Sequence, residues 1–367
     1  MQNNLFLYDQ VKSTLLNRIA IHKWQDGEQI PAEPVLCQNL GVSRVTLRRA
    51  IDELCAKGLL KKLHGKGTFV SSGVDIKRTD SKIWKAILLD DSIYHQVLSG
   101  MEDFAHKHDY AIIFANGKPT RLETQIKRGK ENNVAGYLIR PSLTGDLKNT
   151  ANRDVIAHLS ELRNKKIPLV LINRILKRYK FDAVGTDNSL GGFLATKHLV
   201  GHGFNKIAYL SLPSHYEDRF RLQGYQVAMK AAKKVQIIKK IDYTEKRLGY
   251  KAARELLRDK KPQAVFAFND QMATQVFWAA RELGLTIPED IAVVGYDDQN
   301  AIFTPSIGLT SINQSLFKIG YMASELLLKR IKGDWSDFPI RIRVKPTLVI
   351  RESCGCRDSS VTNASSE

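Results

Sequence analysis

Two arginines four residues apart, Arg44 and Arg48, are the first side chains in this sequence whose chemistry indicates a partner. Guanidinium groups bind guanine edges or phosphates of duplex DNA, and two of them one helical turn apart can face the same groove. Thr46 can reach a phosphate or a thymine methyl group, and Arg49 adds a further charge. The chain carries 56 Lys and Arg residues against 38 Asp and Glu, a net charge of +18 at pH 7. Such a surface attracts polyanions, so these residues indicate DNA.

A second basic cluster follows in the loop formed by His64, Gly65, Lys66 and Gly67. Glycines let a backbone approach the sugar-phosphate chain closely, and His64 or Lys66 could then enter a minor groove. The flanking segments LLKKL and GTFV are typical of two short strands. The loop is therefore expected to be the turn of a β-hairpin.

The arginines must be presented by a helix, and the sequence around them predicts one that begins after Ser43. Ser43 is a good N-cap. One apolar stripe follows at helical spacing: Leu47, Ala50, Ile51 and Leu54. The preceding segment opens with prolines and stops at Gly41, which predicts a shorter helix. Two helices joined by a tight turn form a helix-turn-helix, in which the second helix enters the major groove. The alternative is a basic amphipathic helix with a solvated face beside an ordinary hairpin.

Another set of polar residues stands at the ends of apolar runs. Asn269 stands next to the end of AVFAFND, Asp297 stands next to the end of IAVVGYDD, Arg221 opens RLQGYQVAM, and Tyr94 ends ILLDDSIY. From residue 83 onward, apolar runs alternate with amphipathic segments, which predicts parallel sheets in one barrel or two doubly wound lobes. Ligands bind outside the carboxyl ends of such strands, and these side chains suit sugar hydroxyls. Each could instead be a helix cap, a core residue or a surface charge.

Residues 5–71 resemble the winged helix-turn-helix of GntR-type bacterial transcription regulators. The resemblance rests on the segment IPAEPVLCQNLGVSRVTLRRAIDELCAKGLLKKLHGKGTFV. It implies an α+β winged helix-turn-helix fold for this part of the chain. It also implies DNA contacts from Arg44, Thr46 and Arg48 in the recognition helix, and from residues 65–67 in the wing.

Residues 83–353 resemble the effector-binding domain of LacI/GalR-type regulators. The matching segments are KHLVGHGFNKIAYLS, RLQGYQVAM, AVFAFNDQMATQVFWAARELGLTIPEDIAVVGYDD, TPSIGLTSINQ and KPTLVIRES. The resemblance implies an α/β fold like the periplasmic binding proteins, with parallel sheets in two lobes, three crossovers between them and a homodimer. It implies polar ligand contacts from Arg221, Asn269 and Asp297. The residues at its cleft-lining positions are Tyr94, His95 and Gln314. The LacI-type hinge segment L-x-x-P-x-A is missing, and the order of the two parts resembles arabinose-repressor-type regulators.

These features predict four regions. They are a winged helix-turn-helix DNA-binding domain at 1–71, a linker at 72–82, an effector-binding domain at 83–353 and a disordered tail at 354–367. Within the third region, we expect one lobe over about 83–186 and 315–336, and the other over about 187–313 and 337–353.

The predicted function is a ligand-responsive, sequence-specific regulator of transcription, expected to repress carbohydrate-metabolism genes until a sugar effector binds. Its expected partners are operator DNA, the effector and a second copy of the chain; an activator would fit the same residues. A sugar-modifying enzyme would need a paired acid and base or an activated nucleophile, and no such motif occurs. The DNA-binding head and the missing signal segment disfavour a periplasmic receptor. We therefore expect no enzymatic activity and no cofactor.

The four cysteines form no disulfide framework, which favours a reducing compartment. Cys37 and Cys55 lie in helical apolar patterns and are expected to be buried thiols. Cys354 and Cys356 form a C-x-C pair with no second Cys/His pair nearby in the sequence, so we expect no metal site. No run of about 18 apolar residues occurs, so no membrane helix is predicted and a cytoplasmic location is expected.

Overall fold

The computed structural model describes most of the chain. The described residues are 11, 14–15, 24, 27–40, 42–56, 58–63, 65–71, 82–88, 95–116, 134–143, 150–241, 249–299 and 307–356. The chain divides into two compact units. The first, which we call the head, holds residues 1–83 and 127–134, and the second, the body, holds residues 84–126 and 135–367. None of the described helices is both long and apolar enough to span a membrane.

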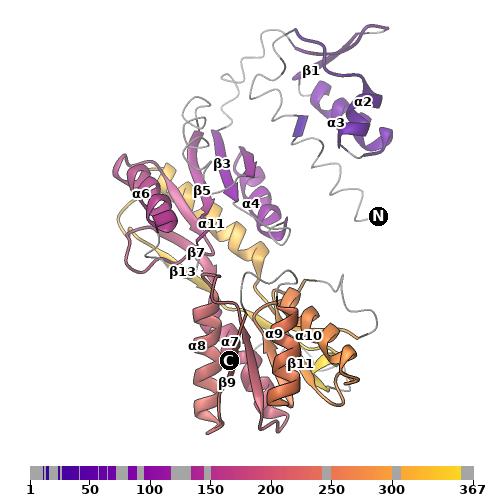
Figure 1. The fold of residues 1–367 in the computed structure, drawn as a ribbon. Helices are drawn as coiled ribbons and strands as arrows, with labels where there is room; N and C mark the ends of the chain where they lie inside the picture. The colour runs from indigo at the N-terminus through magenta and orange to yellow at the C-terminus, as the bar shows by residue number, and fades with distance from the viewer. Residues whose placement is uncertain are drawn as a thin grey trace. The chain divides into compact units, whose positions relative to one another are not determined.

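Among the described residues, the elements of the head with defined bounds are two helices and a hairpin (Figure 1). Its elements are α2 (Glu33–Leu40), α3 (Arg44–Ala56), β1 (Leu60–Leu63) and β2 (Gly67–Val70). The hairpin is antiparallel, with Leu60 opposite Val70 and Leu63 opposite Gly67. The segment before α2 lies along β2, because the backbone N–H of Ile30 donates to the carbonyl of Thr68 at 2.9 Å.

The core of the head is built on the predicted stripe of α3. Leu47, Ala50, Ile51 and Leu54 are all buried. They pack with Leu36, Leu60 and Val70. Cys37 and Cys55 pack against this core but are only half-buried, so the prediction that they are buried thiols is wrong in degree. Both lie at the edges of the apolar stripes, where helical spacing alone does not decide how much of a side chain is covered.

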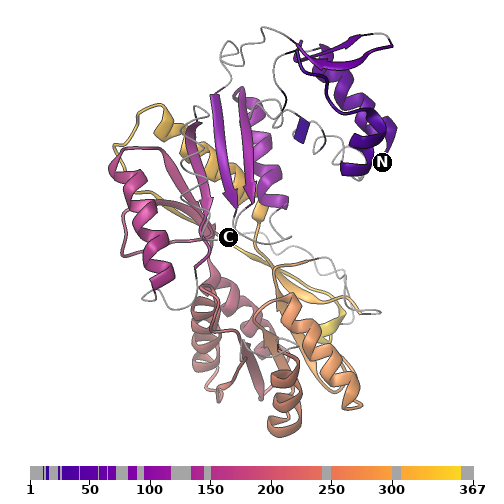
Figure 2. The same ribbon diagram turned by 45° about the horizontal axis from the view of Figure 1, so that its top comes forward.

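The body contains two six-stranded sheets, one in each lobe (Figure 1). The first lobe has the strand order β13-β7-β6-β5-β3-β4. Its strands are β3 (Lys82–Leu88), β4 (Tyr110–Asn116), β5 (Val134–Arg140), β6 (Leu169–Ile172), β7 (Asp182–Thr186) and β13 (Arg341–Val344). Its helices are α4 (His95–Lys107), α6 (Thr150–Asn164) and α11 (Leu316–Ile331). The turned view in Figure 2 shows β3 and β4 side by side at the end of this sheet.

The second lobe has the strand order β14-β12-β11-β10-β8-β9. Its strands are β8 (Ile207–Ser211), β9 (Ile237–Lys240), β10 (Ala264–Ala267), β11 (Ala292–Tyr296), β12 (Thr310–Asn313) and β14 (Thr347–Val349). Its helices are α7 (Asn188–Gly201), α8 (Asp218–Ala231), α9 (Tyr250–Glu255), which continues as a π-helical turn (Leu256–Lys260), and α10 (Asp270–Glu282). Helix α7 packs on α8, and α9 packs on α10.

Parallel pairing dominates both sheets, as the alternation of apolar and amphipathic segments predicts. The pairs β5–β6, β6–β7 and β7–β13 are parallel in the first lobe. In the second lobe the pairs among β8, β9, β10, β11 and β12 are also parallel, while β14 runs antiparallel to β12. Of the two architectures that the sequence allowed, the structure has two lobes and not one barrel. Parallel strands that are buried on both faces need helices on each side of the sheet.

The chain crosses between the lobes three times, after β7, after β12 and after β13. The structure differs from the expected boundaries in two places. Strand β13 belongs to the first lobe, because it pairs with β7, although residues 337–353 were expected in the second lobe. The expected disordered tail began at Cys354, but that residue is fully buried in the core of the second lobe. Residues 357–367 lie outside the described residues.

Candidate DNA-binding surface and effector site

Helix α3 begins at the predicted cap. The hydroxyl of Ser43 accepts a hydrogen bond from the backbone N–H of Thr46 at 3.2 Å, and the two hydroxyls lie 2.8 Å apart. This satisfies one of the four backbone N–H groups that a helix leaves unpaired at its start. Thr46 is half-buried and its hydroxyl contacts the cap, so it has less reach than the arginines beside it.

The arginines of α3 lie on its outer surface. Arg44, Arg48 and Arg49 are all exposed, on the side away from the core stripe. Arg48 donates from Nε to Glu33 Oε2 on α2 at 2.7 Å, although 61% of its side chain remains exposed. A guanidinium has five N–H donors, so this ion pair leaves donors for a ligand while fixing the direction of the side chain. Val45 is also 78% exposed, and an apolar side chain at this position can contact a thymine methyl group.

The hairpin turn requires its glycines. Gly65 and Gly67 have φ values of +71° and +111°, which side chains with a Cβ rarely adopt. A Cβ on Gly67 would lie 2.4 Å from Nε2 of Gln29, the atom that donates to the carbonyl of Lys66 at 2.8 Å. The Lys66 side chain is exposed. His64 lies outside the described residues.

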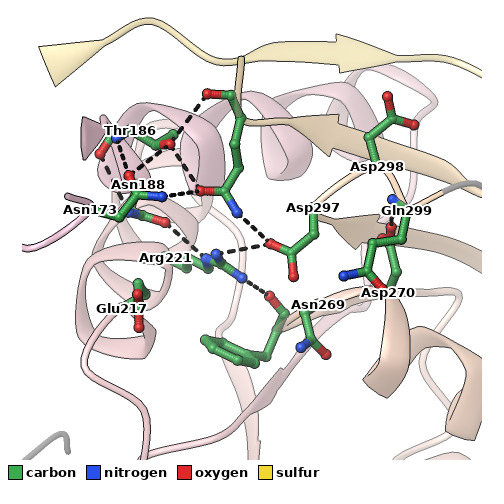
Figure 3. Close-up of polar contacts among 12 residues, drawn as sticks. Asn173, Thr186, Asn188, Glu217, Arg221, Asn269, Asp270, Asp297, Asp298 and Gln299 are labelled. Carbon is green, nitrogen blue, oxygen red and sulfur yellow. Dashed lines mark hydrogen bonds and ion pairs between the residues drawn. The ribbon is translucent and has the colours of Figure 1, made fainter. Parts of the chain in front are cut away.

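In the body, Asp297 accepts two hydrogen bonds on one oxygen (Figure 3). Arg221 donates from Nη2 to Asp297 Oδ1 at 3.1 Å, and Gln314 donates from Nε2 to the same atom at 2.7 Å. Asp297 follows β11, Arg221 lies in α8 and Gln314 follows β12. The structure therefore joins three of the six residues predicted for the effector.

Arg221 is held in a single orientation. Its Nε donates to Asn188 Oδ1 at 2.9 Å, and its Nη1 donates to the carbonyl of Phe268 at 2.6 Å. Its guanidinium carbon lies 3.6 Å from the centre of the Tyr296 ring, within the range of a cation–π contact. The side chain is almost completely buried, so its charge is directed at Asp297 and not screened by water.

Gln314 joins this group to the first lobe. Its Oε1 accepts from the hydroxyl of Thr186 at 2.9 Å and from the amide of Asn173 at 3.5 Å (Figure 3). The Thr186 hydroxyl also lies 3.3 Å from the Gln314 carbonyl. Thr186 ends β7 and Asn173 follows β6, both in the first lobe. Gln314 therefore connects Asp297 with two strand ends of the other lobe.

A buried ion-pair group also spans the lobes. Glu217, which precedes α8, pairs with Arg174, and its Oε1 lies 3.7 Å from Nη2 of Arg140. Arg140 ends β5 and Arg174 follows β6. Burial would raise the pKa of Glu217, but the charges of Arg174 and Arg140 lower it to about 2. Glu217 is thus a carboxylate at any physiological pH.

Two further carboxyl groups have raised pKa values. Burial raises the pKa of Asp297 to about 6, against the lowering effect of Arg221. Burial, and then the charge of Asp297, raise the pKa of Asp270 to about 8. Asp270 Oδ1 accepts from the hydroxyl of Ser311 at 2.6 Å, and Oδ2 accepts from the backbone N–H of Gln299 at 2.7 Å. At neutral pH the ionised group is Asp297, and Asp270 mostly keeps its proton.

Comparison with known proteins supports the division seen in the structure. Residues 7–70 match the gntR family of bacterial regulatory proteins, and residues 196–354 match the periplasmic binding protein-like domain. The chain is 28% identical to the arabinose metabolism transcriptional repressor of Geobacillus stearothermophilus, over 94% of this chain and 97% of that one. It is 31% identical to the HTH-type transcriptional repressor PurR of Vibrio vulnificus, over 71% of this chain and 77% of that one.

The chain belongs to the GntR/LacI-type transcriptional repressors. Among solved structures it resembles the transcriptional regulator CelR in complex with cellobiose, with 25% identity, a TM-score of 0.61, and coverage of 84% of this chain and 90% of that one. The relatives are repressors and not enzymes, in agreement with the prediction from the sequence.

The other three residues predicted to contact the effector of this GntR/LacI-type protein are Asn269, His95 and Tyr94. Asn269 caps α10, because its Oδ1 accepts from the backbone N–H of Met272 at 2.9 Å, so the alternative role that the sequence left open is real. Its Nδ2 atom is still a donor beside the Asp297 group (Figure 3). His95 is the exposed first residue of α4. Tyr94 lies outside the described residues.

Sequence reasoning missed several polar residues of these two groups. Asn173, Thr186 and Asn188 contact Gln314 or Arg221, and Arg140, Arg174 and Glu217 form the ion-pair group. Four of them stand at or just after the ends of β5, β6 and β7, in the segments VAGYLIR, LVLINR and DAVGT. The same strand-end signal that selected Asn269 and Asp297 in the second lobe would have found them in the first.

Proposed function

We propose that this protein is a ligand-responsive, sequence-specific repressor of carbohydrate-metabolism genes, and that a sugar effector relieves the repression. The relatives support this proposal, because one represses arabinose metabolism and a structural relative binds cellobiose. The single observation that carries it is the polar group around Asp297. One buried carboxylate, one guanidinium and one amide converge there, and together they offer the donors and acceptors that a polyhydroxylated ligand requires.

The proposed effector contacts are Arg221, Asn269, Asp297 and Gln314, and the family resemblance adds Tyr94 and His95. Asp297 has an oxygen, Oδ2, that accepts no hydrogen bond within the described residues, so a sugar hydroxyl can donate to it. The amide of Asn269 can donate to a second hydroxyl. Because Arg221 is held by Asn188 and Phe268, its charge stays in place when the ligand arrives.

The proposed coupling runs through Gln314. This residue binds Asp297 and also contacts Thr186 and Asn173 in the other lobe. A sugar that competes for the Asp297 carboxylate changes one end of this connection, and the preferred arrangement of the lobes can change with it. A ligand shifts such an equilibrium only by its difference in affinity for the two states, typically about 1–3 kcal/mol.

The proposed DNA contacts are Arg44, Thr46, Arg48 and Arg49 in α3, and His64, Gly65, Lys66 and Gly67 in the hairpin. In this assignment α3 enters the major groove and the hairpin contacts the adjacent backbone. Residues 1–71 would be the DNA-binding domain, residues 72–82 the linker and residues 83–353 the effector-binding domain. We further propose a homodimer, because two heads on one palindromic operator raise the effective concentration of each.

A two-stage experiment tests the function. Thermal unfolding of the full chain is measured against a panel of pentoses, hexoses and disaccharides, since a bound ligand stabilises in proportion to the logarithm of its excess over Kd. DNA fragments selected from a random pool by the purified protein are then titrated with and without the stabilising sugar. We expect one sugar to raise the Tm and to weaken DNA binding by roughly 5–150-fold. No stabilising sugar, or unchanged DNA affinity with the sugar bound, would contradict the proposal.

A further inference from the structure

Four potential metal ligands that are far apart in the sequence meet in the second lobe. They are His198, His202, Cys354 and Cys356, and their ligand atoms all lie within 4.8 Å of one another. The Sγ atom of Cys356 lies 3.2 Å from Nε2 of His202 and 3.9 Å from Nε2 of His198. None of these residues belongs to the polar group around Asp297 or to the recognition helix, so the proposed function does not account for them.

The two histidines come from the end of α7. His198 lies in its last turn and His202 is the C-cap, with the backbone N–H of His202 bonded to the carbonyl of His198 at 3.2 Å. Residues four apart lie on the same face of a helix. Their ring centres are 4.7 Å apart and the ring planes are inclined by 74°, so both Nε2 atoms can point at one position.

The two cysteines come from a tight turn near the other end of the chain. A short 3₁₀-helix (Glu352–Cys354) ends at Gly355, whose φ of +90° reverses the backbone between Cys354 and Cys356. Cys354 is fully buried, and its thiol contacts the carbonyl of Arg351 at 3.3 Å. Cys356 is half-buried and packs against the same apolar core. The turn thus presents one covered and one accessible thiol to the end of α7.

This set of atoms matches the requirements of one divalent ion. Zinc in structural sites takes four Cys and His ligands in a tetrahedron, with Zn–S near 2.3 Å and Zn–N near 2.0–2.1 Å. Those bond lengths place a sulfur and a nitrogen of the same site about 3.6 Å apart. The distances of 3.2 Å and 3.9 Å from Cys356 Sγ lie on either side of that value. Together with the limit of 4.8 Å on all separations within the set, these distances fit four ligands around one ion.

We propose that His198, His202, Cys354 and Cys356 bind one structural Zn²⁺. The ion would cross-link the turn at residues 354–356 to the carboxyl end of helix α7. Four protein ligands leave no open position, so the ion would stabilise and not catalyse. This cross-link joins a His pair and a Cys pair that are roughly 150 residues apart in the sequence. Cross-links that close long loops restrict the unfolded chain most, so the ion is expected to stabilise the fold. The residues at the carboxyl end of α7 carry the negative end of the helix dipole, which also favours a cation there.

The first test measures the metal itself on the reduced full-length chain. Elemental analysis after expression with zinc should find one Zn²⁺ per chain, and apo protein prepared with a chelator should rebind Zn²⁺ with a Kd tighter than about 1 µM. Co²⁺ added to the apo protein should give the intense visible absorption of a tetrahedral site with thiolate ligands, and Zn²⁺ should abolish it. A chain that binds neither ion in a stoichiometric amount would refute the site.

The exposed His202 and the half-buried Cys356 provide variants that we expect to keep the fold. Cys356→Ser and His202→Gln alter the two more exposed positions, and each should weaken Zn²⁺ affinity by more than about 100-fold. The matched controls are Cys37→Ser in α2 and His158→Gln in α6, which should retain wild-type affinity. Zinc should raise the Tm of the wild type and both controls but not that of the two site variants. Equal zinc binding in the site variants and controls would show that the ion binds elsewhere. Failure of this site would leave the effector and DNA experiments unaffected.

Discussion

At the scale of single residues, the proposed effector site is built around one ionised carboxylate, that of Asp297. Asp297 has a positive φ of 110°, and its side chain is held by Arg221 and Gln314 in a buried setting. Backbone strain of this kind costs of order 1–3 kcal/mol and persists where the surroundings fix it, commonly at functional sites. The strain, the raised pKa and the two donors all coincide at the residue to which the sequence resemblance assigns ligand binding.

Replacing this carboxylate should uncouple the two functions. We expect Asp297→Ala to abolish the response to the effector while DNA binding persists, because the substitution leaves the head unchanged and removes the acceptor shared by Arg221 and Gln314. The measurement is an induction curve of a reporter gene, with DNA affinity determined in parallel. Asp290→Ala, which removes an exposed carboxylate of the same lobe, serves as the control. An unchanged induction curve in Asp297→Ala would rule out this role.

The raised pKa of Asp270 predicts a pH dependence with a definite sign. Its ordinary pKa is 3.8 and its folded value is about 8, so the folded chain binds this proton more tightly than the unfolded chain. Stability from this group is therefore complete below about pH 4 and is lost as the pH rises toward 8. Between pH 5 and 7 we expect this group to contribute a loss of about 2.5 kcal/mol in urea unfolding, which Asp270→Asn should remove, while the smaller loss from the raised pKa of Asp297 remains. A wild-type stability that does not fall across this range would contradict the assignment.

At the scale of elements, the signals in the sequence were strongest where local chemistry decides the structure. The Ser43 cap, the apolar stripe of α3 and the glycines of the hairpin each follow from a backbone requirement, and the structure contains all three. The strand–helix alternation also predicted the parallel sheets. Partners distant in the sequence were harder to foresee. The C-x-C pair and the histidines of α7 lie about 150 residues apart, and only the folded second lobe brings them together.

The same limit explains the misplaced strand. Strand β13 has the sequence RIRV, which pairs with β7 in the first lobe. Its short polar–apolar alternation predicts a strand but carries no information about which sheet it joins. The connection to β14 then returns the chain to the second lobe. Neither lobe is continuous in the sequence, so lobe boundaries depend on pairings that local patterns do not encode.

Helices α2 and α3 are linked by the contact between Arg48 and Glu33, which allows two roles for this arginine to be separated. Arg48→Ala should weaken specific DNA binding by about 1–3 kcal/mol if the side chain contacts DNA. Glu33→Gln removes the ion pair but keeps the arginine, and exposed ion pairs contribute at most about 1 kcal/mol. Electrophoretic mobility-shift titrations of both variants distinguish the roles, with circular dichroism and thermal unfolding of each full-length variant as the check on folding. Equal losses in the two variants would reduce Arg48 to a positioning residue between the helices.

At the scale of the whole molecule, the charge of +18 should make DNA binding strongly dependent on salt. Each phosphate neutralised by the protein releases counterions, and the logarithm of the affinity falls by about 0.9 per phosphate for each unit of log salt. We expect a steep linear plot between about 50 and 200 mM salt for the wild type. Lys66→Ala should lower the slope by roughly one unit if the hairpin contacts a phosphate. A flat plot for the wild type would argue against a phosphate-rich interface.

The buried ion pairs between the lobes lead to a prediction about the stability of the body. Glu217 comes from the second lobe and faces Arg140 and Arg174 from the first, so neutralising it removes a carboxylate that pairs with two buried cations. Breaking a buried pair in this way typically costs about 3–5 kcal/mol, whereas an exposed pair is worth less than about 1 kcal/mol. We therefore expect Glu217→Gln to lower the stability of the body far more than Glu255→Gln, which breaks the more exposed pair with Lys239 in the second lobe. Denaturant unfolding of both variants measures the difference. Equal stabilities would mean that the lobes do not depend on this ion pair, and the effector would then have to act on the Gln314 contact alone.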